Sequence, residues 1–155
     1  MKDMYIQALS KCYNHVSLSI TTETEILNPL NGILVKTMCL WDTGATISGV
    51  SKSLAEKLEL FPVQRTRVKD VHGENDVNVY LIDLILQGNF LKMAIPVAEC
   101  NELSNDGSVS ILVGMDVISR GDFCITNYEG KTTMTFRIPS MEKIIFEGSD
   151  IELLP

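Results

Sequence analysis

The stretch LWDTGATISG, residues 40–49, decides how the chain is interpreted. The apolar run from Met38 to Trp41 leads directly into Asp42, and a Thr-Gly-Ala sequence follows. A carboxylate is rarely fully buried without a partner that compensates for its lost hydration. On its own, Asp42 would be interpreted as a turn residue at the end of a strand, because Asp and Gly are common turn formers. The remainder of the sequence has to decide whether this acid has a partner.

Length and composition restrict the classes of protein to consider. The chain has 155 residues, 45% of them hydrophobic and 21% charged, as expected for one soluble globular domain. Its net charge is −7 and its cations are not clustered, which argues against a nucleic-acid partner. No apolar segment approaches the roughly 20 residues that a membrane span needs. We therefore predict one domain over residues 1–155, with neither a nucleic-acid nor a membrane partner.

The cysteines indicate a reducing compartment. They form no CxxC pair and no metal-ligand spacing with either histidine, and the N-terminus lacks the apolar core of a signal peptide. We interpret them as buried free thiols of a cytoplasmic protein and predict neither a metal site nor a cofactor. The cysteines are Cys12, Cys39, Cys100 and Cys124.

Alternation of apolar and polar residues, which is typical of β-strands, dominates the sequence. One helix is expected over residues 51–60, with Ser53 and Glu56 as a capping box, and one helical turn over 116–121 with Asp116 as its N-cap. These patterns predict a mainly β architecture, with a closed or strongly curled sheet and one or two short helices. The expected strands are 15–20, 33–41, 68–71, 77–86, 90–97, 110–114, 123–126 and 132–138.

A second landmark changes the interpretation of Asp42. About 70 residues further on, the apolar run Ile111-Leu112-Val113 again ends in a glycine, Gly114. An apolar strand, Asp-Thr-Gly-Ala, a helix, a glycine-tipped hairpin, an apolar strand ending in Gly and a short helix occur in that order. This order resembles the retropepsin-like aspartic proteases, and bacterial or phage members more than viral ones, over about residues 14–127. The resemblance implies the single-lobed acid-protease β-barrel, with its core at about residues 14–138 and extra strands or a tail after it.

The resemblance also implies an activity. Aspartic proteases hydrolyse peptide bonds with two carboxylates that share one proton, because two like charges about 3 Å apart cannot both ionise. This sequence contains one Asp-Thr-Gly. The partner of Asp42 is therefore expected to be Asp42 of a second copy, in a symmetric homodimer that cuts extended polypeptides.

The residues that match the family motif take roles from the resemblance. Asp42 would be the catalytic residue. Thr43 and Gly44 would support the loop, Thr43 by a hydrogen bond across the two-fold axis and Gly44 by letting its backbone N–H approach the carboxylate. Ala45 would leave room for the substrate backbone, and residues 111–114 would pack behind the loop.

The polar hairpin that follows the helix would be the flap. A flap closes over an extended peptide, pairs with its backbone and excludes water. Val71, His72 and Gly73 would therefore contribute to substrate binding. A plain surface hairpin would have the same pattern, and neither His72 nor Glu74 is assigned a catalytic role.

Two other hypotheses remain open. Retroviral members carry an Arg that ties their dimer together where this chain has Met115. This difference motivates the hypothesis that the chain is a catalytically silent module of the same fold, which binds peptides or dimerises. An unrelated β-barrel with an incidental Asp-Thr-Gly is the third hypothesis. The intact Asp42-Thr43-Gly44 sequence favours the enzyme.

Overall fold

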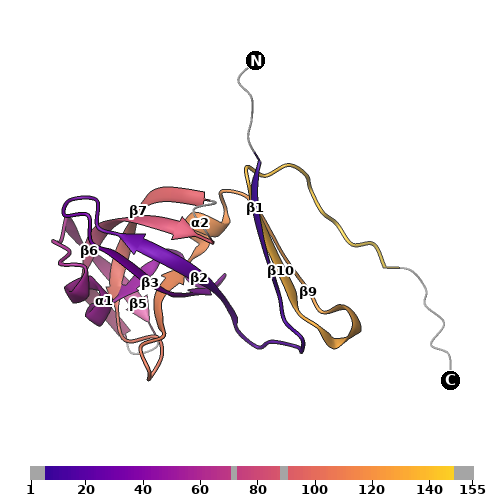
Figure 1. Cartoon of the computed structure of the whole chain (residues 1–155), viewed down its shortest axis with the longest axis horizontal. Helices are drawn as coiled ribbons and strands as arrows, with labels where there is room; N and C mark the ends of the chain where they lie inside the picture. Colours follow the sequence, from indigo (N-terminus) through magenta and orange to yellow (C-terminus); the bar gives the residue numbers. More distant parts are fainter. Residues whose placement is uncertain (1–5, 71–72, 88–90, 149–155) are drawn as a thin grey trace, which may run out of the picture.

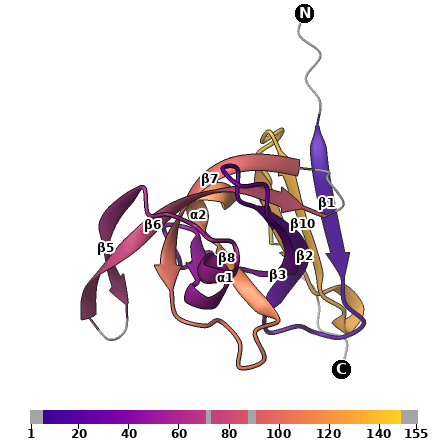
Figure 2. The ribbon, with the colours of Figure 1, turned by 60° about the vertical axis from the view of Figure 1, so that its left-hand side comes forward.

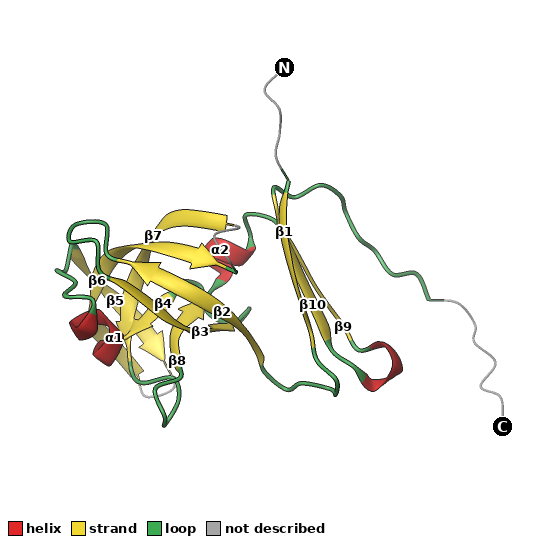
Figure 3. Ribbon diagram, in the orientation of Figure 1, coloured by secondary structure: helices red, strands yellow, loops and turns green. Residues whose placement is uncertain are grey.

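Strands dominate the structure, a computed structural model that describes residues 6–70, 73–87 and 91–148 (Figure 3). In these ranges the helices are short and the strands form two sheets. The strands are β1 (Gln7–Cys12), β2 (Ile20–Leu27), β3 (Leu34–Trp41), β4 (Gly49–Ser51), β5 (Gln64–Asp70), β6 (Gly73–Leu86), β7 (Leu91–Cys100), β8 (Val109–Val113), β9 (Asp122–Thr126) and β10 (Thr133–Ile138). The helices are α1 (Lys52–Lys57), α2 (Met115–Ile118) and the 3-10 helix η1 (Tyr128–Gly130).

The larger sheet closes into a barrel. Its strand order is β2-β3-β8-β4-β7-β6-β5, and β2 also pairs with β6, so six strands form a ring and β5 lies outside it (Figure 2). The pairs β3–β8 and β4–β7 are parallel, whereas the other pairs in the ring are antiparallel. The predicted mainly β barrel with short helices is confirmed.

Alternating side chains fill the barrel. On β2, Ile20 and Ile26 are buried, and Thr22 and Thr24 between them are buried as well. The Thr24 hydroxyl donates to the Ile85 carbonyl oxygen at 2.9 Å, so this polar group is satisfied inside the sheet. Each fully buried aliphatic side chain contributes about 1.5–3 kcal/mol to folding. The fully enclosed aliphatic side chains of the core include Ile26, Val50, Leu58, Ile82, Leu84, Leu86, Ile95, Val97, Ile111 and Val113.

The smaller sheet has the order β1-β10-β9 and lies beside the barrel (Figure 1). Aromatic rings join the two. The Trp41 ring stacks on Phe123 of β9 with centroids 5.5 Å apart and packs against Phe136 of β10 at 5.0 Å. Trp41 Nε1 donates to Thr22 Oγ1 at 2.9 Å, which holds the indole in place. The last residue of β3 is thus also the centre of the contact between the sheets.

The segment before β2 differs from expectation. Residues 15–19 form a loop, and the expected strand over 15–20 is wrong, because Leu18 is 99% exposed and has no sheet to face. The loop instead bonds to Thr132, whose Oγ1 accepts from Ser17 N at 2.8 Å and whose N–H donates to the His15 carbonyl at 3.0 Å. This loop connects β1 of the smaller sheet with β2 of the barrel, so its alternation of apolar and polar residues does not mark a strand.

The helix caps also differ from the predicted ones. The N-cap of α1 is Ser51, whose Oγ accepts from Leu54 N at 3.3 Å. Ser53 instead bonds to Glu102, through its N–H at 3.0 Å and its hydroxyl at 2.8 Å, so the predicted capping box is wrong. The N-cap of α2 is Gly114, and Asp116 lies within the first turn.

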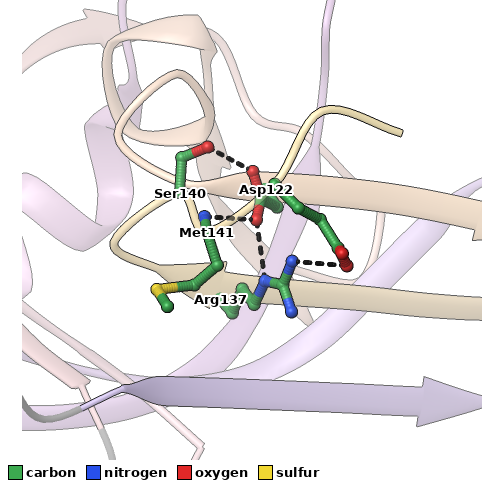
Figure 4. Close-up of polar contacts among 5 residues, drawn as sticks. Asp122, Arg137, Ser140 and Met141 are labelled. Atoms are coloured by element: carbon green, nitrogen blue, oxygen red, sulfur yellow. Dashed lines mark hydrogen bonds and ion pairs between the residues drawn. The ribbon is translucent and has the colours of Figure 1, made fainter. Parts of the chain in front are cut away.

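A carboxylate anchors the segment that follows β10 (Figure 4). Asp122 accepts hydrogen bonds from Met141 N at 2.8 Å, from the Ser140 hydroxyl and from Arg137 Nε at 2.7 Å. Arg137 Nη2 also contacts Glu142 Oε1 at 2.9 Å. These donors, the Met141 amide first, hold the pKa of the Asp122 carboxyl well below its usual range.

The thiols are all free, but their burial varies. Cys39 is buried in the core, and burial raises its pKa to about 11. Cys12 is exposed, and Cys100 and Cys124 are only partly buried, so the expectation of buried thiols is confirmed for Cys39 alone. In the parts of the chain that the structure covers, no helix has the length and apolar character needed to cross a membrane.

Candidate functional site

Asp42 lies where β3 leaves the barrel and the chain turns toward β4. Its backbone N–H donates to the Val113 carbonyl oxygen at 2.9 Å, which continues the parallel pairing of β3 with β8 by one residue. Trp41, immediately before it, is buried in the aromatic contact between the sheets. The backbone of Asp42 is therefore held by the buried Trp41 before it and by its hydrogen bond to β8.

The loop itself orients the carboxylate. Gly44 N donates to Asp42 Oδ1 at 2.8 Å, and Ala45 N donates to the Asp42 carbonyl oxygen at 3.2 Å. A Cβ at position 44 would lie 3.1 Å from Asp42 Oδ1, closer than nearly all real contacts of this kind. Thr43 and Gly44 are exposed, and Asp42 and Ala45 are partly exposed. The four residues form a turn that holds one carboxylate oxygen and faces solvent.

The apolar strand and glycine at residues 111–114 lie directly behind this turn. Gly114 approaches the loop so closely that a Cβ there would lie 2.9 Å from the Ala45 carbonyl oxygen and from the Ile47 carbonyl carbon. The next residue, Met115, donates its N–H to the Ala45 carbonyl oxygen at 2.8 Å. A glycine is therefore required by the close approach of two backbones.

Ser48, which was not singled out from the sequence, completes the support. Its hydroxyl donates to Asp116 Oδ1 at 2.7 Å and accepts from Gly114 N at 3.0 Å, and the residue is fully buried. The segment around it contains several small hydroxyl residues, so no local pattern distinguishes this serine from its neighbours. Asp116, expected as a helix cap, serves as its partner.

The carboxylate has capacity for a further partner. Within the described part of the chain, the carboxylate of Asp42 accepts one hydrogen bond, from Gly44. An ionised carboxylate offers about four acceptor positions on two oxygens. Chemically, the loop presents an oriented acid that can accept a proton, donate one, or share one with a second acid.

The predicted flap is a hairpin of β5 and β6. Its strands pair from Gln64 with Val79 to Asp70 with Gly73. Gly73 has φ +123°, in the region that favours glycine, and opens β6. Val71 and His72 lie outside the described residues. Figure 2 shows the hairpin extending outward from the barrel wall.

A hollow in the described surface lies elsewhere. It has a volume of about 520 Å³ and is lined by parts of β2 and β3 together with Ile85, Gln87 and Ser108. It does not include residues 42–45. Among the residues with described positions, no three His, Cys, Asp or Glu side chains gather as a metal site would require.

Comparison with known proteins finds one family model and several solved structures that resemble this chain. Residues 31–102 match the model of the spumavirus aspartic protease (A9) family. The simian foamy virus (mac) protease is 27% identical, with a TM-score of 0.45, over 64% of this chain and 92% of that one. A retropepsin-like aspartic protease from Rickettsia conorii is 14% identical, with a TM-score of 0.52, over 88% and 98%. The EIAV protease, solved with the inhibitor HBY-793, is 20% identical, with a TM-score of 0.45, over 69% and 90%. The Rickettsia structure shares the fold.

Proposed function

Since residues 31–102 match the spumavirus aspartic protease family and the chain has the retropepsin-like fold, we propose that it is an aspartic endopeptidase whose catalytic residue is Asp42. The observation that carries the proposal is the position of this acid. It follows the buried Trp41 at the end of β3, its Oδ1 is held by the Gly44 N–H, and its turn packs against Gly114. A carboxylate oriented by backbone groups needs little reorganisation during the reaction.

The proposed enzyme is a homodimer. One chain supplies one Asp-Thr-Gly turn, and peptide hydrolysis by this route needs two carboxylates. Two copies related by a two-fold axis through the turns would bring both Asp42 side chains together. The partly exposed position of Asp42 leaves its carboxylate open to such a partner. Thr43, exposed beside it, would bond across the axis.

In the proposed mechanism the two Asp42 carboxylates share one proton. The ionised one removes a proton from a water molecule, which attacks the peptide carbonyl carbon, while the protonated one donates its proton to the carbonyl oxygen. The tetrahedral species then breaks down: the carboxyl group that took the proton from water gives it to the leaving amine, and the other carboxylate takes a proton back from the hydroxyl group, which restores the shared proton. The extended polypeptide would lie over Ala45 and beneath the β5–β6 hairpin, with Val71, His72 and Gly73 contacting its backbone.

Cleavage of a peptide library between pH 4 and 7 tests the proposal. We expect the wild-type protein to cut extended peptides and the Asp42→Asn variant to lose cleavage by at least about a thousandfold, because the nucleophilic water loses its base. Equal cleavage by both proteins would refute the assignment of Asp42. A folded, dimeric wild-type protein that cuts nothing would instead favour a silent peptide-binding module.

A further inference from the structure

The peptide unit between Val113 and Gly114 connects Ser48 to Asp42. Its carbonyl oxygen accepts a hydrogen bond from Asp42 N at 2.9 Å, and its N–H donates to Ser48 Oγ at 3.0 Å. A peptide unit is planar and rigid, so a tilt at one of these groups moves the other. The Ser48 hydroxyl and the backbone of Asp42 are therefore attached to opposite ends of one rigid group.

The direction of the Ser48 hydroxyl is itself fixed. Its single proton is donated to Asp116 Oδ1 at 2.7 Å, so that a lone pair remains for the Gly114 N–H. Asp116 Oδ1 also accepts from Val117 N at 3.1 Å, which ties it to the first turn of α2. Ser48 and the Gly114 N–H are both buried, so removal of the hydroxyl would leave that N–H without its acceptor.

We propose that Ser48 is a positioning residue for the reaction at Asp42, acting through the Val113–Gly114 peptide and oriented by Asp116. This inference rests on the proposed function. Two carboxylates that share a proton must lie close together, and a displacement of about 1 Å can reduce a rate about a hundredfold. In a symmetric dimer both Asp42 turns would shift together, so the change in their separation would be twice that in either subunit.

Three variants separate positioning from folding. Ser48→Ala removes the hydroxyl, and Asp116→Ala removes the group that orients it. Asp116→Asn keeps an oxygen that can accept from Ser48 and from Val117 N. Ser110→Ala is the matched control, because Ser110 is also buried and donates to the Gly107 carbonyl at 3.1 Å, away from the turn.

The measurements are kcat and KM on a peptide that the wild-type protein cleaves, with light scattering and thermal unfolding of each variant. We expect kcat to fall about 10- to 100-fold in Ser48→Ala and Asp116→Ala, with KM within about twofold. Asp116→Asn and Ser110→Ala should stay within about threefold of wild type. The double variant Ser48→Ala/Asp116→Ala should lose no more than Ser48→Ala alone, because the two groups act in one chain of contacts.

Several results would overturn the inference. One is a kcat for Ser48→Ala equal to that of Ser110→Ala, and another is a loss that appears in KM alone. If Ser48→Ala fails to fold, the same two results measured on Asp116→Ala would overturn the inference: a kcat equal to that of Ser110→Ala, or a loss in KM alone. A folded wild-type dimer without any activity would refute the proposed function and this inference together, whereas an active wild type with an unaffected Ser48→Ala would refute this inference alone.

Discussion

At the scale of single residues, Gly44 offers the most direct test of the Asp42 turn. In Gly44→Ala the added Cβ would lie 3.1 Å from Asp42 Oδ1, so the carboxylate or the turn has to move. We expect kcat on a cleaved peptide to fall about tenfold or more, because the geometry of the carboxylate changes. Gly148→Ala is the control, since a Cβ there meets no atom within 4 Å. Equal kcat values for the two variants would contradict the role given to Gly44.

The residues of the turn also show what a sequence can and cannot reveal. Asp42, Gly44 and Gly114 could be singled out because their types are unusual where they stand, an acid and glycines at the ends of apolar strands. Ser48 could not be, since it is one of several hydroxyl residues in this stretch, some buried and some exposed, and no local pattern distinguishes it. Its importance depends on contacts with Gly114 and Asp116, which lie 66 and 68 positions away and meet it only in the folded chain.

At the scale of elements, the aromatic contact between the two sheets should contribute most of the free energy that holds the smaller sheet against the barrel. Phe136 of β10 is 1% exposed and packs against Trp41. Phe136→Ala should lower the free energy of unfolding by about 3–5 kcal/mol, through lost burial and the cavity left behind. Tyr128→Ala, at a residue that is 78% exposed, should change it by less than about 0.5 kcal/mol. Urea unfolding measures both, and equal midpoints would contradict the prediction.

The anchor of the C-terminal segment predicts a pH dependence. The pKa of Asp122 is lowered in the folded protein, so the anchor stabilises the fold above the ordinary Asp pKa of about 4. That contribution to stability is lost only as the pH falls through the lowered pKa that Asp122 has in the folded protein. At pH 4 the Met141 amide should therefore still exchange more slowly than its intrinsic rate at that pH. In Asp122→Asn this protection should be lost, whereas Glu142→Gln, which leaves the Met141 bond intact, should exchange as wild type does.

The sequence predicts the strands best where burial within the barrel sets their pattern of apolar and polar residues. The strands β3 and β8 lie within one residue of their expected ranges, because their apolar runs match their position in the barrel. The hairpin of β5 and β6 was expected, but both of its strands begin four residues earlier than predicted, at Gln64 and Gly73. The smaller sheet was only partly foreseen. Its β1 strand, Gln7–Cys12, is mixed in polarity and pairs with β10 more than 120 residues later in the chain. No pattern within residues 7–12 indicates which distant strand they pair with.

At the scale of the whole molecule, a shared active site has a consequence that a self-contained one lacks. If both Asp42 side chains are needed, a heterodimer of wild-type and Asp42→Asn chains has one carboxylate and is inactive. Mixing equal amounts and allowing subunits to exchange should reduce the activity to about half that of the same wild-type protein alone, because half of the wild-type chains enter heterodimers. An excess of the variant should reduce it further.

The mixing experiment needs a control for dilution and for nonspecific association. Wild-type protein mixed with bovine serum albumin at the same total concentration should keep its full activity. Dilution of wild type alone should lower the specific activity in parallel with the mass measured by light scattering, since dissociation separates the two carboxylates. A fully active monomer, or an activity unaffected by exchanged Asp42→Asn chains, would mean that Asp42 does not depend on a second copy. The acid would then have to find its partner within its own chain, where the described residues offer it the Gly44 N–H.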